Sequence, residues 1–334
     1  MAHKLSIGIV GLPNVGKSTL FKTLTNQDIT IANYPFATID PNVGIVPVPD
    51  ERLNVLTKLS GSKKTVPAVV EFYDIAGLVK GANKGEGLGN QFLANIRDTQ
   101  AIVVVLRVFK NDDIIHVENS VDPIRDMEII NGELMLKDLE TIEKRLSSLE
   151  KEARSGDKKA AKSQEILNQV RNRLLASKLV HDLAGEEVIK ELQLLSAKKQ
   201  LYLLNGEPEE VSHDLREKIM ELGADYLICD LKETTETVSE LVKKAYGVLN
   251  LISFFTTGED ETRAWTITQG TLAPQAAGVI HTDFESKFIR AEVVPYEKLV
   301  EAGNWNGAKQ KGWLGVQGKE YEMKDGDVIV VRHG

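Results

Sequence analysis

The sequence contains a single cysteine, Cys229, among its 334 residues. One thiol cannot form an internal disulfide, so a disulfide-stabilised secreted fold is excluded and a reducing compartment fits the composition. Long apolar runs are also lacking, because the longest, AIVVVL at 101–106, is far shorter than a membrane span. Acidic residues outnumber basic ones, and the formal net charge of −8 excludes a protein that coats nucleic acid over its whole surface. We therefore expect a cytoplasmic protein with no membrane partner and no DNA partner.

The most informative motif lies near the N-terminus. Residues 11–18 read GLPNVGKS and match the phosphate-loop pattern G-x-x-x-x-G-K-[ST] at every required position. Backbone N–H groups of such a loop, and the N-terminus of the helix after it, bind phosphate oxygens. Lys17 is expected to reach the β- and γ-phosphates, and the Ser18 hydroxyl to ligate Mg²⁺. The flanking segments agree, since LSIGIV at 5–10 predicts a buried strand and 18–25 has helical spacing. The expected nucleotide-binding residues of this loop are Asn14, Val15, Gly16, Lys17, Ser18 and Thr19.

A second motif supports nucleoside triphosphatase chemistry. VVEFYDIAG at 69–77 predicts an apolar strand that ends in D-x-x-G. The Asp74 carboxylate can hold magnesium, usually through a water, and the Gly77 backbone N–H can sense a γ-phosphate. The D-x-x-G pattern alone is common, but on a strand that follows a phosphate loop it predicts a triphosphatase.

The strand pattern predicts an α/β fold with a doubly wound sheet, interrupted by a long helical segment. No strand signal occurs between about residues 122 and 195. Apolar residues there repeat at intervals of three and four on both sides of a turn at 155–157, which predicts an antiparallel helical hairpin of coiled-coil type. These apolar residues are Leu139, Ile142, Leu146 and Leu149 before the turn, and Leu167, Val170 and Leu174 after it. The predicted strands are 5–10, 43–47, 69–73, 101–108, 200–204 and 225–229.

The tip of the predicted hairpin is basic although the chain is acidic overall. Such a cluster can contact a phosphate backbone, but a solvated helix end is the commoner explanation. No aromatic side chain interleaves the cluster, so base stacking is not expected there. The basic residues are Lys151, Arg154, Lys158, Lys159 and Lys162.

From about Ser253 onward, short alternating segments separated by glycine-bearing turns predict a small mixed β domain, which we interpret as a docking module. The predicted strands are WTIT at 265–268, GVIH at 278–281, FIRAEVVPY at 288–296 and VIVVRH at 328–333. The predicted organisation is thus a nucleotide domain in two parts, a helical insertion between them and a C-terminal domain. Their ranges are 1–121 and 196–252 for the nucleotide domain, 122–195 for the insertion and 253–334 for the last domain.

Several long stretches resemble the YchF family of Obg-related P-loop proteins, which includes the Obg-like ATPases. The resemblance implies a P-loop G domain, an inserted helical coiled-coil hairpin and a C-terminal TGS domain of β-grasp form. It also implies a nucleotide-dependent switch that associates with ribosomes or ribosomal RNA and prefers ATP to GTP. By resemblance, Thr38 ligates Mg²⁺ when triphosphate is bound, and Asn14 matches an asparagine associated with K⁺ ligation. The stretches are GLPNVGKSTLFKTLT, NYPFATIDPNVG, FYDIAGLVKGANKGEGLGNQFLANIRDTQAIVVVLR, HVENSVDPIRDMEIINGEL and FFTTGEDETRAWTITQGTLAPQAAGVIHTDFESKFIRAEVV.

The base-recognition segment departs from the family pattern. Guanine-specific relatives carry N-K-x-D, and the family has N-x-x-E, whereas LYLLNGEPEE at 201–210 offers Asn205 followed three residues later by Pro208. Without a carboxylate at that position, the main reason to prefer guanine is lost, and adenine or relaxed specificity follows. A preference for GTP would require Glu207 or Glu209, which flank Pro208, to take the place of the missing acid.

A second sequence resembles a base-recognition motif but lies at the wrong place in the chain. Ser196-Ala197-Lys198 resembles the S-A-K sequence that stacks on a base in related proteins. It precedes the predicted strand that ends at Asn205 instead of following it, so we do not assign it to the base.

The hydrolytic residue is not given by the D-x-x-G motif, because Leu78 stands where many switch proteins have a water-orienting glutamine. Intrinsic hydrolysis is therefore expected to be slow, on the order of 10⁻³ s⁻¹. His116 is the first candidate to orient the water, and the alternative is a loop histidine that packs or caps. K⁺ bound at Asn14 could supply positive charge between the phosphates. The catalytic candidates are His116, Lys17 and Asn14, and weaker ones are Lys80, Lys84 and Arg97.

These observations predict a slow P-loop ATPase with a magnesium cofactor that acts as a ribosome-associated switch. A GTP-specific switch is the first alternative. A P-loop kinase that phosphorylates a small molecule is another, although no acceptor pocket or arginine-bearing lid is evident in the sequence. A binding module with a structural nucleotide is disfavoured by the complete set of Lys17, Ser18, Thr38 and Asp74.

Overall fold

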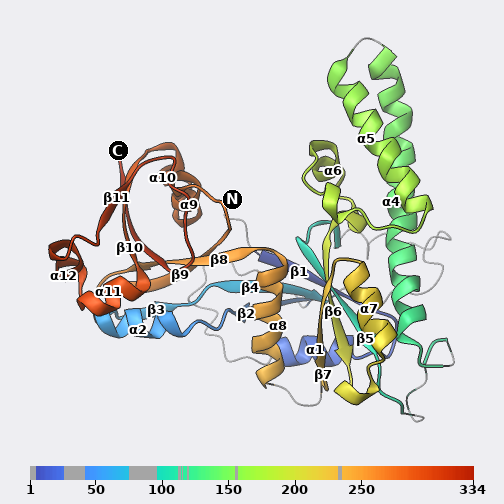
Figure 1. Cartoon of the computed structure of the whole chain (residues 1–334), viewed down its shortest axis with the longest axis horizontal. Helices are drawn as coiled ribbons and strands as arrows, with labels where there is room; N and C mark the ends of the chain where they lie inside the picture. The colour runs from blue at the N-terminus through green and yellow to red at the C-terminus, as the bar shows by residue number, and fades with distance from the viewer. Residues whose placement is uncertain are drawn as a thin grey trace.

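The computed structural model describes residues 5–25, 42–74, 96–111, 114, 116–118, 120–154, 157–231 and 235–334. These residues form two six-stranded sheets, and a long helical pair stands away from both (Figure 1). Within the described residues, no helix combines the length and the apolar character that crossing a membrane requires.

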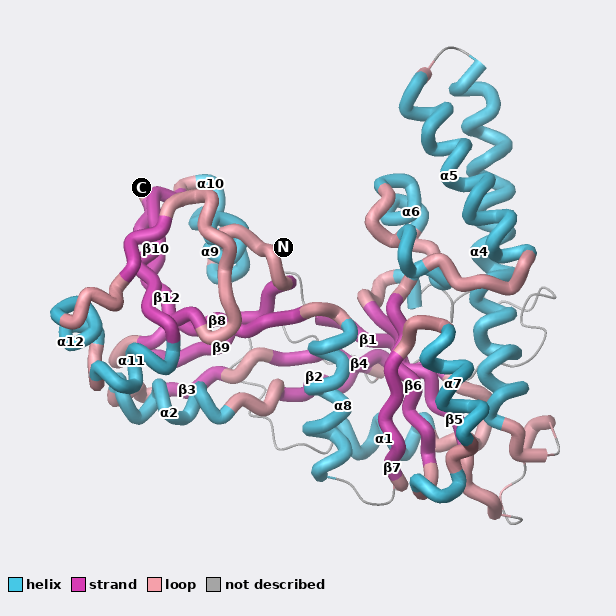
Figure 2. Tube along the Cα trace, viewed as in Figure 1, coloured by secondary structure: helices cyan, strands magenta, loops and turns pink. Residues whose placement is uncertain are grey.

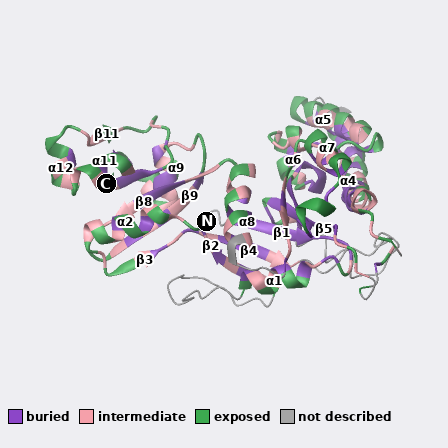
Figure 3. Ribbon diagram, turned by 60° about the horizontal axis from the view of Figure 1, so that its bottom comes forward, coloured by how far each residue is buried: buried purple, intermediate pink, exposed green. Residues whose placement is uncertain are grey.

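The first sheet has the strand order β2-β4-β1-β5-β6-β7, and all its neighbours are parallel except β2 and β4. Its central strands are apolar on both faces because helices cover both, and every residue of β1 and β5 is buried (Figure 3). The six predicted strands are all present, with ends within one residue of those predicted. They are β1 (Leu5–Val10), β2 (Val43–Pro47), β4 (Val69–Asp74), β5 (Ala101–Arg107), β6 (Lys199–Asn205) and β7 (Asp225–Cys229). Helices α1 (Lys17–Thr25), α7 (His213–Glu221) and α8 (Thr235–Val248) pack against this sheet.

The helical pair consists of α4 (Pro123–Arg154) and α5 (Lys158–Leu175), which pack antiparallel and protrude from the first sheet (Figure 2). The repeated apolar residues of both helices lie in one buried cluster, which is separate from the core of the sheet. Asp157 begins α5 by accepting hydrogen bonds from the backbone N–H groups of Lys159 and Ala160. Short helices return the chain to β6: η2 (His181–Leu183), α6 (Glu187–Leu192) and η3 (Leu195–Ala197).

Asp138 anchors α4 to the sheet. Its fully buried carboxylate accepts hydrogen bonds from the backbone N–H groups of Leu195 and Ser196, at 2.9 and 2.7 Å, and from the Ser196 hydroxyl at 2.5 Å. Lys198 donates to the backbone carbonyls of Arg97 and Thr99. The S-A-K sequence therefore lies at the start of β6, at the opposite end of that strand from Asn205, where it holds the helical pair.

The second sheet has the order β11-β10-β12-β8-β9-β3 and joins the C-terminal domain to a segment from the first half of the chain. Helix α2 (Glu51–Ser60) packs on this sheet, and β3 pairs with β9 in parallel (Figure 1). The strands are β3 (Lys64–Val66), β8 (Leu251–Thr257), β9 (Glu261–Thr268), β10 (Phe288–Pro295), β11 (Gly315–Gln317) and β12 (Asp327–His333). The helices of this domain are α9 (Ala273–Ile280), α10 (Thr282–Ser286), α11 (Tyr296–Ala302) and α12 (Trp305–Gln310).

One predicted strand of the C-terminal domain is wrong. GVIH at 278–281 was expected to be extended, but its first three residues end helix α9. The helix begins with Pro274 in its first turn, and the Leu272 backbone N–H donates to the Gln275 side chain, as in half of a capping box. These start signals and the alanines after them outweigh the β-branched residues at the end.

The Asp138 anchor gives the first testable expectation. Replacing Asp138 with alanine leaves two buried backbone N–H groups and a buried hydroxyl without an acceptor, and should lower the free energy of unfolding by about 2–4 kcal/mol. Urea unfolding followed by circular dichroism measures this change. Glu140→Ala, an exposed site on the same helix, is the matched control and should change stability by less than about 0.5 kcal/mol. Equal effects of the two substitutions would contradict the anchoring role.

Candidate nucleotide-binding site

The phosphate loop joins β1 to α1 and has a conformation that only certain residues adopt easily. Asn14 and Gly16 have positive φ angles of 63° and 109°. Asparagine tolerates this left-handed region better than most side chains, and glycine has no Cβ to clash. At Gly11, an added Cβ would lie 2.7 Å from the Val105 carbonyl oxygen of the neighbouring strand. These positions let the loop curl closely against the sheet and present its backbone N–H groups.

Lys17 and Asp74 occupy the phosphate end of the site. Lys17 is buried, and its Nζ donates to the Leu12 carbonyl within the loop at 2.7 Å. Burial lowers the pKa of Lys17 to about 8, and the Asp74 charge opposes this shift. Asp74 ends β4 beside β1, where burial raises the pKa of its carboxyl group and Lys17 opposes that shift. The two groups of the phosphate-loop and D-x-x-G motifs therefore lie close enough to interact electrostatically.

The donor set fits a magnesium ion. Ser18 is the exposed second residue of α1 and offers a hydroxyl oxygen, and Asp74 offers a carboxylate. Hard oxygen ligands of this kind are those that Mg²⁺ prefers, with water and phosphate oxygens filling the other positions. The third predicted ligand, Thr38, and the predicted γ-phosphate contact, Gly77, lie outside the described residues.

A cavity of about 440 Å³ opens beside the loop, within the size range of nucleotide pockets. The phosphate loop and the ends of three parallel strands form its walls, as expected at the carboxyl edge of such a sheet. Of the predicted residues, Asn14, Gly16, Lys17, Ser18, Thr19 and Asn205 line it. Glu207, which the sequence analysis considered as a replacement for the missing acid, also lines it. The lining residues that sequence analysis did not assign are Phe109, Lys110, Asn111, Ile114, Gly206, Glu210, Asp230 and Leu231. Val15 is buried behind the cavity, where its carbonyl oxygen faces Asn205.

Asn205 joins three parts of this site. Its Nδ2 donates to the Val15 carbonyl at 2.9 Å, and its Oδ1 accepts from the Leu231 backbone N–H at 3.3 Å. A Cβ added to Gly16 would lie 2.5 Å from Nδ2, so this glycine also permits the contact. The buried amide thus holds the phosphate loop and the segment after β7 against the end of β6.

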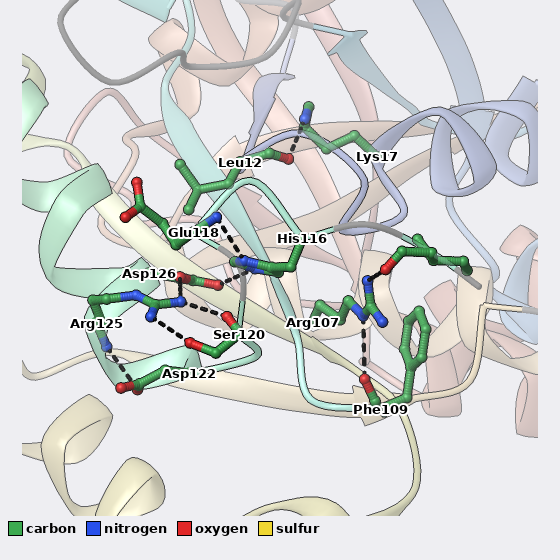
Figure 4. Close-up of polar contacts among 11 residues, drawn as sticks. Leu12, Lys17, Arg107, Phe109, His116, Glu118, Ser120, Asp122, Arg125 and Asp126 are labelled. Atoms are coloured by element: carbon green, nitrogen blue, oxygen red, sulfur yellow. Dashed lines mark hydrogen bonds and ion pairs between the residues drawn. The ribbon is translucent and has the colours of Figure 1, made fainter. Parts of the chain in front are cut away.

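Arg107, which sequence analysis missed, organises one wall of the cavity. Its buried guanidinium donates to the carbonyl oxygen of Phe109 at 3.2 Å (Figure 4). It also donates to the carbonyl oxygens of Asn111 and Ile114, at 2.8 and 2.9 Å. It also lies over the Phe109 ring, 4.4 Å from the centroid. The sequence signal for this role was an arginine at the end of an otherwise wholly apolar segment, AIVVVLR at 101–107.

His116 lies next to this loop but points toward the helical pair. Its Nε2 lies 2.8 Å from Oδ2 of Asp126 in the first turn of α4, and its Nδ1 accepts from the Glu118 backbone N–H (Figure 4). Because Nδ1 accepts, a neutral ring carries its proton on Nε2 and donates it to Asp126. Arg125 donates to the other oxygen of Asp126. In this arrangement both ring nitrogens are engaged, and His116 is not among the described residues that line the cavity.

The fold and the site together define a P-loop nucleotide-binding protein of the GTPase class. Comparison with known families agrees, since residues 6–139 match the family described as 50S ribosome-binding GTPase. Residues 251–334 match the YchF-GTPase_C family, described as a protein of unknown function.

Whole-chain comparisons are more specific. The chain is 45% identical to ribosome-binding ATPase YchF of Bacillus subtilis, covering 98% of this chain and 99% of that protein. It is 43% identical to human Obg-like ATPase 1, covering 97% and 91%. It also resembles the structure of the Schizosaccharomyces pombe YchF GTPase, with 39% identity, a TM-score of 0.81 and 98% of both chains covered. The chain belongs to the YchF family, and it is a nucleoside triphosphate hydrolase.

The lowered pKa of Lys17 predicts how triphosphate binding depends on pH. Above about pH 8 the empty site loses the lysine proton, whereas bound phosphates favour the charged ammonium. Affinity for ATP should therefore fall by up to about tenfold per pH unit above pH 8, with uptake of about one proton on binding at pH 9 and much less at pH 7. Calorimetry in buffers of different ionisation enthalpy measures both quantities.

Lys22, an exposed lysine on the same helix, provides the control for this experiment. Lys22→Ala should keep the affinity and its pH dependence. Affinity that stays constant from pH 7 to 9.5, with no proton uptake, would show that Lys17 does not titrate in this range.

Proposed function

We propose that this protein is a slow, magnesium-dependent ATPase that works as a molecular switch on the ribosome. The observation that carries the proposal is the phosphate loop with Lys17 facing Asp74, beside a cavity of nucleotide size. The names of the relatives, ribosome-binding ATPase and Obg-like ATPase, supply the nucleotide and the partner. The cytoplasm is the compartment that a ribosome-bound switch requires.

In this proposal the loop residues bind and orient the triphosphate. Lys17 leaves the Leu12 carbonyl and donates to the β- and γ-phosphates. Ser18, Thr38 and Asp74 would hold Mg²⁺, which would supply positive charge beside the phosphates. Asn14, whose backbone is already in the left-handed region, faces the same space and is the proposed ligand of K⁺. Gly77 donates its N–H to the γ-phosphate.

His116 remains our candidate for orienting the attacking water, and its contacts define a condition for that role. Its Nε2–H must first leave Asp126, because a ring held at both nitrogens cannot contact water at the phosphate. Turnover would then depend on how firmly the first turn of α4 holds His116, which is compatible with slow intrinsic hydrolysis.

The chain organisation supports a division of labour. We propose a G domain in two parts, 1–121 and 196–252, a coiled-coil arm at 122–195 and a TGS domain of β-grasp form at 253–334. Helix α2 and strand β3 pack with the last domain although they precede it by almost 200 residues in sequence. The arm and the TGS domain are the proposed ribosome contacts, and the exposed residues Lys158 and Lys159 near the arm tip suit ribosomal RNA.

Lys17→Ala tests the proposal directly. Without the ammonium, ATP hydrolysis should fall by at least about 100-fold, and ATP-dependent co-sedimentation with ribosomes should be lost. Phosphate release measured by a coupled assay and sedimentation through sucrose give the two readouts, and Lys22→Ala is the matched control. Unchanged hydrolysis in Lys17→Ala would refute the assignment of the active site. Transfer of phosphate to a small molecule, rather than to water, would favour a kinase.

His116→Ala separates the two roles considered for that residue. If His116 orients water, turnover should fall by about 10- to 100-fold while the Kd for ATP changes little. If it only packs against Asp126, the melting temperature should fall and turnover should stay the same. His281→Ala, at an exposed histidine of the C-terminal domain, should affect neither quantity and serves as the control.

A GTP-specific switch is the second candidate function, and one observation favours it. Glu207, Glu210 and Asp230 all line the cavity and supply the carboxylates that guanine-specific sites use. Side-by-side binding of ATP and GTP analogues decides between the two, with a tenfold preference corresponding to about 1.4 kcal/mol.

A further inference from the structure

The acid that the family pattern places three residues after Asn205 is replaced by Pro208, but the turn that Pro208 begins returns another carboxylate to the site. Residues Pro208–Glu210 form the 3₁₀ turn η4. Proline fits the first position of such a turn because its φ is preset and its missing N–H is not needed there. At the end of the turn, Oε2 of Glu210 accepts a hydrogen bond from the Glu207 backbone N–H at 3.0 Å.

The Glu210 carboxylate is thereby brought back beside Gly206, the residue that follows Asn205. A Cβ added to Gly206 would lie 2.7 Å from Oε2 of Glu210 and 2.6 Å from a methyl group of Val108. Gly206 also has a φ of 150°, which side chains rarely adopt. A glycine at this position leaves the space that the carboxylate occupies.

Two backbone carbonyl contacts hold the turn, so the carboxylate is restrained before any ligand arrives. The Glu210 backbone N–H donates to the Glu207 carbonyl at 3.0 Å, and Arg216 of α7 donates to the Pro208 carbonyl at 2.9 Å. Ser212 caps α7 directly after the turn. Ligand binding then loses less side-chain entropy than it would with a freely rotating glutamate.

Glu210 and its neighbour Glu209 differ in where they face. Glu210 lines the nucleotide cavity together with Asn205 and Asp230, whereas Glu209 is not among the described residues that line it. Within the described part of the chain, Oε1 of Glu210 accepts no hydrogen bond, so one acceptor oxygen remains for a ligand.

We propose that Glu210 is the specificity-determining acid of this site, and that its Oε1 accepts a hydrogen bond from the 6-amino group of adenine. Guanine presents two adjacent donors, N1–H and the 2-amino group, which call for both oxygens of a carboxylate. In Glu210, Oε2 is already bonded to the Glu207 N–H, so this carboxylate presents one oxygen without a protein partner and matches the single 6-amino donor of adenine better than the paired donors of guanine. This inference rests on the proposed ATPase function and identifies how its base is selected.

The test compares base-modified triphosphates in the full-length protein with magnesium present. ATP, purine riboside triphosphate, which lacks the 6-amino group, and GTP are titrated into the wild type, Glu210→Ala and Glu210→Gln. The wild type should bind ATP at least about tenfold more tightly than purine riboside triphosphate. In Glu210→Ala this ratio should fall to near one, through weaker binding of ATP and unchanged binding of purine riboside triphosphate.

Two substitutions to glutamine show whether the effect comes from the Glu210 carboxylate itself. Glu210→Gln retains the shape of the side chain and one acceptor oxygen, and should lose only part of the ratio. Glu209→Gln, on the same turn, should behave as the wild type. A ratio that is the same in Glu210→Ala and the wild type would overturn the inference.

The outcomes also separate this inference from the proposed function. If all three triphosphates bind the wild type but weaken equally in Glu210→Ala, Glu210 only supports the turn, and the nucleotide-binding function stands. If the wild type binds none of them, the proposed function itself fails. Tighter binding of GTP than ATP by the wild type would overturn the assignment to adenine.

Discussion

The buried amide of Asn205 is the contact on which the rest of the nucleotide site depends. It satisfies the Val15 carbonyl of the phosphate loop and the backbone N–H of Leu231 after β7, while the strand β6 fixes its own position. Buried polar groups that lose their partner cost about 1–3 kcal/mol each, so no other side chain of similar size could replace it without loosening two loops at once. Asn205 therefore sets the shape of the cavity as well as lining it. Gly16 and Gly206 follow from the same constraint, since each leaves room for a side chain packed beside it.

The helical pair is connected to the nucleotide site through buried polar contacts along α4. At its first turn Asp126 holds His116, which follows the cavity-lining loop. Halfway along the helix, Asp138 holds η3, the short turn that leads into β6. Almost one turn beyond Asp138, Thr141 accepts a hydrogen bond from Arg97, which precedes β5. Burial of a carboxylate is unfavourable unless it is fully hydrogen-bonded, so Asp126 and Asp138 restrict where α4 can sit. A movement of His116 would therefore act directly on α4 through its contact with Asp126.

The sequence predicted the first sheet well because its signals are local. Buried parallel strands are continuous apolar runs, and the phosphate loop is a contiguous motif whose residues must be neighbours in sequence. Features that depend on distant partners were missed: Lys64–Val66 is a strand only because Glu261–Arg263 pairs with it. The role of Arg107 was missed for the same reason, because it consists of hydrogen bonds to three carbonyl oxygens of the loop after β5. Glu210 was passed over because motif spacing pointed to position 208, whereas the turn displaces the carboxylate by two residues.

The strand that carries Asp74 follows directly in sequence after β3, a strand of the C-terminal sheet. After β2, the chain leaves the first sheet, packs α2 on β8 and β9, pairs β3 with β9, and only then returns as β4 to end at Asp74. Arg52 of α2 also attaches this helix to the C-terminal domain, because its guanidinium bonds Asp325 of that domain at 2.7 Å and Asp50, the N-cap of its own helix, at 2.8 Å. Bidentate arginine contacts of this kind hold orientation as well as distance. The C-terminal domain is therefore not joined through a flexible linker alone, because the chain crosses to it between β2 and β4 and again after α8, and β3 pairs within its sheet directly before the strand that ends at Asp74.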